Sequence, residues 1–137
     1  MKIFWIGLLL LFILSTGTQA QRLQNSSRST IGYIKDGRVQ NKSYSTIGYI
    51  KNGRVQNKSY STIGYIKDGR FQNKSYSTIG YLRNDRVQNR SYSTIGYIKN
   101  GRVQDKNYKT IGYYDKSKVS REEVAAFFFF FFNKKNR

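Results

Sequence analysis

The chain contains no cysteine, no proline and no histidine among its 137 residues. Without cysteine there is neither a disulfide nor a lipid-modified thiol, so packing and backbone pairing alone must stabilise the fold. Without histidine and cysteine the chain also lacks the commonest general base, the thiol nucleophile and the usual soft metal ligands. We therefore expect a protein that is not an enzyme, with no catalytic residues, no metal site and no cofactor.

Acidic residues are also scarce, since seven Asp and Glu stand against 25 Lys and Arg and give a net charge of +18. Asp36, Asp68 and Asp85 occupy predicted turns, where aspartate is common for conformational reasons. Glu122 and Glu123 suit the first turn of a helix better than they suit a catalytic carboxylate pair. The positive charge predicts either an anionic partner or a solvated surface that keeps a β-protein soluble.

The longest apolar run lies near the N-terminus. A lysine precedes the apolar stretch Ile3–Leu14, and Thr18-Gln19-Ala20 has the small residues of a cleavage site. The run is shorter than the ~20 residues that span a bilayer. The sequence therefore predicts a signal peptide over residues 1–20, cleaved between Ala20 and Gln21. We expect an exported protein, periplasmic or secreted, with no transmembrane span after cleavage; an uncleaved anchor is the alternative.

The sequence is dominated by a repeat of sixteen residues. STIGYIKDGRVQNKSY starts at Ser29 and returns almost unchanged at Ser45, Ser61, Ser77 and Ser93. Each copy has Asp-Gly or a close variant between two short stretches of β-branched and aromatic residues. That pattern predicts a β-hairpin with a two-residue type I′ turn.

The predicted register fixes which residues share a face of the sheet. Lys35 faces Arg38 across the first hairpin. Alternation places Ile34 and Val39 on one face, and Ile31 with Tyr33 on the other. A glycine recurs between the equivalents of these last two residues, and it indicates a close backbone approach or a β-bulge.

One turn departs from the pattern, because Asn84-Asp85 stands where the other units have Asp-Gly or Asn-Gly. We expect Asp85 to adopt the positive φ that glycine adopts elsewhere, at a cost in stability.

Half-units flank the five complete copies. Arg22–Arg28 (RLQNSSR) matches the second half of a unit, and Lys109–Tyr114 (KTIGYY) matches the first half. Two half-units that pair with each other would close a ring and remove exposed strand edges. We therefore expect an all-β domain over residues 21–119, a closed or nearly closed ring of hairpins; an open solenoid is the alternative. Whether the ring holds five or six hairpins stays open.

Residues 120–137 break the repeat and predict a short helix with a basic tail that packs on the repeat domain. Ser120 and Glu123 form a capping box, and six consecutive phenylalanines follow at Phe127–Phe132. A helix that is apolar on all sides needs apolar surroundings. Three interpretations compete: a plug in the middle of the ring, which we prefer, a contact with a membrane or partner, and a β-strand or aggregation-prone tail.

These features resemble a known family. The unit S-T-I-G-Y-I-K-D-G-R-V-Q-N-x-S-Y, behind a signal peptide and ahead of an Ala-Ala-Phe-rich C-terminus, resembles the five-fold beta-flower proteins, which are small exported bacterial repeat proteins. The resemblance covers nearly all of Arg22 to Phe132. It implies a closed all-β fold of hairpins around a central axis and implies no established activity. Thr-Ile-Gly-Tyr occurs six times here, so the chain departs from a five-fold count.

The functional hypothesis rests on basic and aromatic residues that repeat together in the Asn-Lys-Ser-Tyr loop. The loop tyrosines are free to stack on a ligand, whereas strand tyrosines such as Tyr33 are expected to pack. The Asn-x-Ser pattern of the same loop is interpreted as loop structure, not as a glycosylation acceptor. The candidate ligand-binding residues are Tyr44, Tyr60, Tyr76, Tyr92 and Tyr108, with Lys42, Lys58, Lys74, Arg90 and Lys106.

These residues predict a binding module for an anionic polysaccharide, an envelope glycan or a lipid headgroup surface. Single-stranded nucleic acid suits the same chemistry, but export argues against that partner. The alternative is a structural or assembly protein that self-associates through its hairpin faces or its Phe-rich helix.

Overall fold

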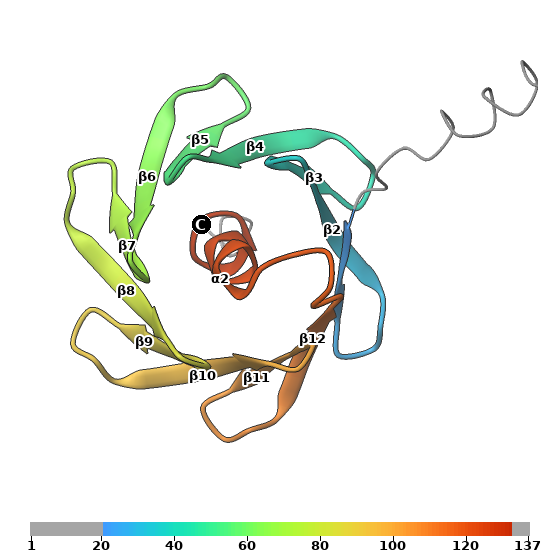
Figure 1. Ribbon diagram of the computed structural model, residues 1–137. Helices are drawn as coiled ribbons and strands as arrows, with labels where there is room; N and C mark the ends of the chain where they lie inside the picture. The colour runs from blue at the N-terminus through green and yellow to red at the C-terminus, as the bar shows by residue number, and fades with distance from the viewer. Residues whose placement is uncertain (1–20, 133–137) are drawn as a thin grey trace, which may run out of the picture.

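The computed structural model describes residues 21–132 (Figure 1). The predicted signal peptide, most of its cleavage site and the basic tail lie outside these residues. The described chain forms twelve strands and one helix. They are β1 (Gln21–Asn25), β2 (Thr30–Lys35), β3 (Arg38–Asn41), β4 (Thr46–Lys51), β5 (Arg54–Asn57), β6 (Thr62–Lys67), β7 (Arg70–Asn73), β8 (Thr78–Arg83), β9 (Arg86–Asn89), β10 (Thr94–Lys99), β11 (Arg102–Asp105), β12 (Thr110–Tyr114) and α2 (Arg121–Phe130).

The strands form one closed antiparallel barrel in which sequence neighbours pair and β1 pairs with β12. At this closure Leu23 lies opposite Tyr114, as Val39 lies opposite Ile34 between β3 and β2. The terminal half-units therefore build a hairpin without a turn, and the predicted closed ring is confirmed. The ring has six positions, five of them intact hairpins and the sixth shared by the two ends of the repeat region.

Two-residue turns join the strands of the intact hairpins, as predicted. Asp36 has φ of 50° and Gly37 has φ of 79°, and positive φ at both central residues is the mark of a type I′ turn. At the exceptional turn, Asn84 has φ of 56° but Asp85 does not adopt positive φ. The expectation for Asp85 is therefore wrong: its backbone avoids the left-handed region, and its carboxylate accepts a hydrogen bond from Arg121.

The recurrent strand glycine coincides with a β-bulge and also with a close approach. Between β3 and β4, Val39 lies opposite Gly48 and Gln40 opposite Thr46, so Ile47 is an extra residue. The same shift occurs at the other five junctions. The bulge brings the isoleucine to the core side, and Ile31 packs against the core. Its predicted position on the Tyr33 face is therefore wrong, because strict alternation stops at the bulge.

Helix α2 lies inside the ring (Figure 1). The predicted capping box is confirmed, since the Ser120 hydroxyl accepts from the Glu123 N–H and the Glu123 carboxylate accepts from the Ser120 N–H. Val124, Ala125 and Ala126 are fully buried against the strands. Within residues 21–132 no helix is long and apolar enough to cross a membrane.

The phenylalanine run is the plug of the ring. Five of its rings radiate from the helix, and each approaches one strand glycine so closely that a Cβ atom there would clash with or touch the ring. The pairs are Phe127 with Gly32, Phe131 with Gly48, Phe130 with Gly64, Phe129 with Gly80, and Phe128 with Gly112. At Gly32, Gly48, Gly64 and Gly80 the phenylalanine ring occupies the space that a side chain would need, whereas at Gly112 it only touches the position of a Cβ.

Candidate functional site

The loop that follows each hairpin is organised by an asparagine or aspartate side chain. Asn41 Oδ1 accepts hydrogen bonds from the backbone N–H groups of Ser43 and Ser45, at 2.9 and 3.0 Å. The Asn41 carbonyl accepts from the Tyr44 N–H at 3.0 Å. Equivalent side-chain bonds recur at Asn25, Asn57, Asn73, Asn89 and Asp105. The asparagine of the Asn-x-Ser pattern thus stabilises the loop through hydrogen bonds to its backbone.

This loop holds Tyr44 in the left-handed conformation, with φ of 67°. The Tyr44 ring stacks on Tyr33, with centroids 4.4 Å apart and planes inclined by 16°. Four more pairs have the same geometry: Tyr49–Tyr60, Tyr65–Tyr76, Tyr81–Tyr92 and Tyr97–Tyr108. The strand tyrosines do pack, but on the loop tyrosines outside the core. Because the loop tyrosines are 56–64% exposed, much of each ring remains available to a ligand.

The sixth position carries a variant of this pair. Arg28 stands where the other loops have tyrosine, also with positive φ, 63°. Its guanidinium carbon lies 4.0 Å from the centroid of the Tyr113 ring, so a cation–π contact replaces the aromatic stack. The outer surface therefore bears six aromatic platforms, five Tyr–Tyr and one Arg–Tyr.

A groove separates an aromatic pair from the turn of the preceding hairpin. Between the first two hairpins it has a volume of about 640 Å³. The turn is held in place because Ile50 N–H donates to the Gly37 carbonyl at 2.7 Å. The groove is lined by Lys35, Asp36, Gly37, Arg38, Tyr49, Lys51, Gln56 and Tyr60.

The same kind of groove occurs at the closure of the ring, where β1 meets β12. It has a volume of about 530 Å³ and is lined in part by Arg28, Arg102 and Tyr113. Here the Arg–Tyr platform takes the place of the stacked tyrosines, and the turn Asn100-Gly101 takes the place of Asp36-Gly37.

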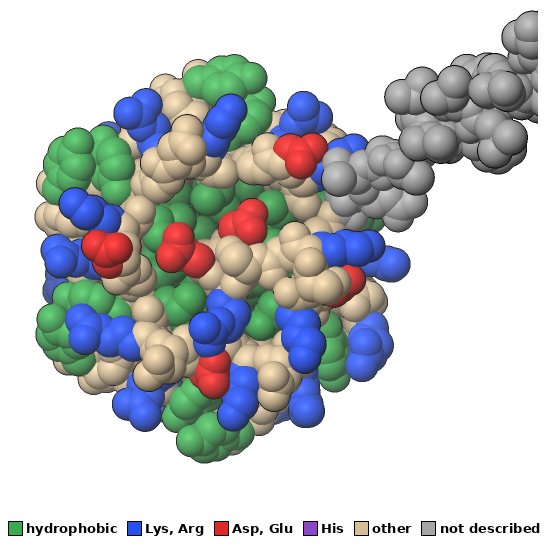
Figure 2. Space-filling model, in the orientation of Figure 1, with side chains coloured by type: hydrophobic (Ala, Val, Ile, Leu, Met, Phe, Trp, Pro, Cys, Tyr) green, Lys and Arg blue, Asp and Glu red, His purple; other side chains and the backbone are tan. Residues whose placement is uncertain are grey.

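Strand register places an arginine beside every platform. Arg38 is the cross-strand partner of Tyr49, so the two side chains share the outer face. The other partners are Arg22 with Tyr33, Arg54 with Tyr65, Arg70 with Tyr81, Arg86 with Tyr97, and Arg102 with Tyr113. Figure 2 shows Lys and Arg side chains around the edge of the viewed face, between clusters of the hydrophobic class that includes Tyr.

Hydrogen bonds between hydroxyl groups join several stacked pairs. Tyr49 Oη donates to Tyr60 Oη at 3.0 Å, and Tyr33 donates to Tyr44 at 3.1 Å. This bond raises the pKa of Tyr49 above its usual value of 10.0, and the nearby Arg38 guanidinium offsets part of the rise. Tyr49 is therefore neutral at physiological pH and lies beside the permanently charged Arg38.

The predicted site residues fall into two groups. The loop tyrosines occupy the platforms, and Tyr60 lines a groove. The loop cations Lys42, Lys58, Lys74, Arg90 and Lys106 are exposed, but none of them lines either of the two grooves.

The groove cations are instead residues that flank the turns, such as Lys35, Arg38 and Lys51. The predicted pairing of Lys35 with Arg38 is confirmed, but neither residue is among the predicted ligand-binding residues. The missing signal was the pairing of successive hairpins, which brings each turn to the aromatic pair of the next unit. Among residues 21–132 no group of three or more acidic, His or Cys side chains gathers in a way that would hold a metal.

Comparison with known families gives one match. The family model described as 5-fold beta-flower protein matches residues 20–132, which is most of the chain and includes the whole ring and its plug. Comparison with curated proteins and with solved structures gave no significant match.

Proposed function

The chain belongs to the 5-fold beta-flower protein family, and we propose that it is an exported, non-enzymatic binding protein for an anionic glycan. One observation carries this proposal. Around the outside of the ring, stacked tyrosine pairs recur beside arginine residues that the strand register places directly opposite them.

The chemistry of a groove suits a sugar that bears a negative charge. The exposed ring of Tyr60 offers a flat apolar surface for the C–H face of a sugar ring, while its hydroxyl and Gln56 offer hydrogen bonds. Arg38 presents a planar fork of N–H donors that matches a carboxylate or sulfate group. Lys35 and Lys51 add positive charge to the same groove, and the net charge of +18 attracts a polyanion over a longer range.

Repetition would multiply a weak interaction. Each platform is exposed, so a single sugar residue is expected to bind weakly. A polymer that occupies one groove raises the local concentration of its next residues at the neighbouring groove, and such linkage raises affinity by about 10²–10⁴. The proposal therefore concerns a polymeric glycan that follows the circumference of the ring.

The test is calorimetric titration of the protein with a uronic-acid or sulfated polysaccharide and with a neutral polysaccharide of similar length. We expect the anionic polymer to bind and the neutral one to bind far more weakly. A variant with Ser at Tyr44, Tyr60, Tyr76, Tyr92 and Tyr108 should lose most of the affinity, and the matched variant with Phe at these positions should keep most of it. Equal binding of the Ser variant and the parent would contradict the proposal.

A second candidate function is self-assembly through one end of the ring. Ile95, Ile111 and Phe132 are 40–45% exposed, an unusual feature for large apolar side chains on a highly charged protein. If this end packs against another copy, sedimentation should show oligomers that dissociate on dilution. A monomer at all concentrations would remove this candidate.

A further inference from the structure

The ring has six strand glycines, but the helix supplies a phenylalanine to only five of them. At Gly96 the atoms nearest to an added Cβ are backbone atoms of Gln104 and Asp105, with no ring among them. The flanking glycines in the ring, Gly80 and Gly112, receive Phe129 and Phe128. Successive helical residues differ by about 100° in direction, so these two neighbouring rings diverge and leave the sector between them unfilled.

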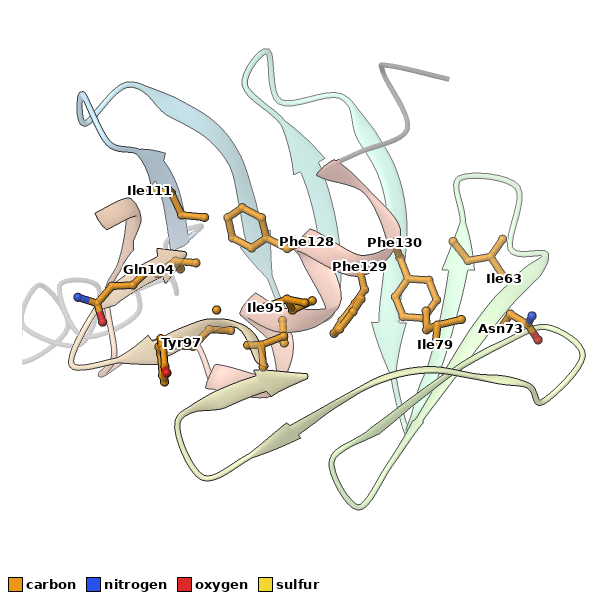
Figure 3. Close-up of a pocket in the computed structure, with 15 residues that line it drawn as sticks. Ile63, Asn73, Ile79, Ile95, Tyr97, Gln104, Ile111, Phe128, Phe129 and Phe130 are labelled. Carbon is orange, nitrogen blue, oxygen red and sulfur yellow. The ribbon is translucent and has the colours of Figure 1, made fainter. Parts of the chain in front are cut away.

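An apolar cavity of about 630 Å³ extends from this sector. The bulged isoleucines in its lining, Ile63, Ile79, Ile95 and Ile111, come from four consecutive positions of the ring, which makes the cavity elongated. Figure 3 shows Phe128 directed toward Ile111 and Phe130 toward Ile79 and Ile63. No charged side chain lines the cavity; its polar side chains are Asn73, Tyr97 and Gln104.

The exposed fractions of equivalent residues in successive repeats also show that side chains fill this sector less completely than the others. Val39, Val55, Phe71 and Val103 are buried, with exposed fractions of 0–6%. Their equivalent Val87, the cross-strand partner of Gly96, is partly exposed. Likewise, among the six bulged isoleucines, Ile95 and Ile111 are exposed, whereas the other four are partly buried.

We propose that this cavity binds the alkyl chain of an amphiphile with an anionic head group, either a free long-chain carboxylate or one chain of an anionic lipid. The lining is mostly apolar and carries no charged side chain, so an ion would lose its hydration there without a counter-charge, whereas an alkyl chain would gain apolar contacts. The elongated shape fits a linear chain better than a compact ring. The volume lies within the ~300–1,000 Å³ that is typical of small-molecule sites.

The charge at the open end identifies the head group. Ile95 and Ile111 each follow a loop at the same end of the barrel, Asn89–Ser93 and Asp105–Lys109 respectively. The second loop carries Lys106 and also Lys109, where the five other loops have serine. The repeat that borders the cavity is thus the one with an additional cation. A second copy of the chain would cover the opening but would not fill a space that reaches inward to Ala125.

The experiment is a calorimetric titration of the protein with n-alkanoates and n-alkanols of increasing chain length, below their micelle concentrations. For both series we expect affinity to rise about fourfold per methylene until the cavity is full, and then to level off. At equal chain length the alkanoate should bind more tightly than the alkanol. Alkanoate binding without chain-length dependence, or no binding of long alkanols, would overturn the proposal, because the basic surface alone would then explain it.

A variant from the repeat itself blocks the cavity. Phe71 is opposite Gly80 and packs on Phe129, with ring centroids 4.8 Å apart. Val87→Phe places the same side chain opposite Gly96, in the empty sector. It should weaken alkanoate binding at least tenfold and raise the melting temperature, since it fills a void. Ile95→Phe at the opening is a second blocking variant. Because Ile95 is exposed, the larger side chain should not disturb the fold.

The matched control is Tyr44→Ser, in the loop between β3 and β4, whose bulged isoleucine Ile47 does not line the cavity; it should leave alkanoate affinity unchanged even if it weakens glycan binding. Parent-like alkanoate affinity in both Val87→Phe and Ile95→Phe would overturn the proposal. Vesicles of phosphatidylglycerol identify the source of the chain. Co-sedimentation that both blocking variants abolish supports a lipid chain, and binding of monomeric alkanoate without co-sedimentation supports a free carboxylate.

Discussion

Arg121, the first residue of helix α2, donates hydrogen bonds to the carbonyl oxygen of Asn84 at 2.9 Å and to the carboxylate of Asp85. The turn that lacks glycine is therefore the turn to which the plug is attached. Lys99 lies 3.9 Å from the same carboxylate. The break in the repeat at Asp85 breaks the symmetry of the ring and gives the single helix one preferred point of attachment.

The first prediction follows from this attachment. Asp85→Gly should lower the free energy of unfolding by about 0.5–1 kcal/mol, the range of a partly exposed ion pair. Glycine brings no relief of strain, because Asp85 does not adopt positive φ. Urea denaturation of Asp85→Gly, Arg121→Gln and the double variant measures the coupling directly. A more stable Asp85→Gly variant, or zero coupling, would show that the contact does not hold the helix.

The second prediction separates the plug from the sheet. Gly64→Ala and Gly96→Ala both bring a Cβ to 2.6 Å from a cross-strand glutamine carbonyl, so both should be destabilising. Only Gly64→Ala also meets a phenylalanine, Phe130. It should therefore lose about 1–3 kcal/mol more than Gly96→Ala, the usual range for overpacking.

Denaturant titration of these two variants measures the difference in their free energies of unfolding. The loss of glycine and the clash with the cross-strand carbonyl are the same in both variants, so the difference reports the contact with Phe130. Equal losses of stability would mean that the Phe130 side chain moves aside at little cost and is not tightly packed against Gly64.

The third prediction concerns pH. Hydrogen bonds with partner tyrosines raise the pKa of Tyr44, Tyr49, Tyr65, Tyr92 and Tyr97 above 10.0. A pKa that is higher in the folded state stabilises the fold below the unfolded value, and this contribution is lost as pH rises through the folded value. The melting temperature should thus fall as pH increases above about 10.

A matched variant isolates this effect from the titration of lysines. Phe at the five loop tyrosines keeps the stacked rings but removes the hydroxyl pairs, so its melting temperature should fall less steeply over the same pH range. Parallel curves for the parent and the Phe variant would exclude the hydroxyl pairs as the cause.

Much of the fold could be predicted because the same local sequence signals for a turn and two strands recur in every repeat. The turn dipeptides, the half-units at both ends and the Ser120–Glu123 capping box are local signals, and the structure follows them. The position of Ile31 could not be predicted in this way, because a bulge shifts the alternation of side chains. The contact of Asp85 with Arg121 could not be predicted either, because the two residues are 36 positions apart in the chain.

The candidate site was only half predictable for a related reason. Loop tyrosines can be recognised in one repeat, since they lie in a polar loop with no apolar neighbours. The groove needs two repeats, because Arg38 belongs to one hairpin and the Tyr49–Tyr60 pair belongs to the next. The pairing of successive hairpins therefore determines which cations face the aromatic platforms, and the sequence of a single repeat does not reveal it.

The most direct test of the account compares two variants with the same loss of charge. One replaces Arg38, Arg54, Arg70, Arg86 and Arg102 beside the platforms with Gln; the other replaces Lys42, Lys58, Lys74, Arg90 and Lys106 in the loops with Gln. Affinity for the anionic polysaccharide is measured for both variants and the parent at increasing salt, which screens exposed charges. We predict that the platform variant binds at least tenfold more weakly than the loop variant at every salt concentration. Equal affinities, or weaker binding by the loop variant, would contradict it.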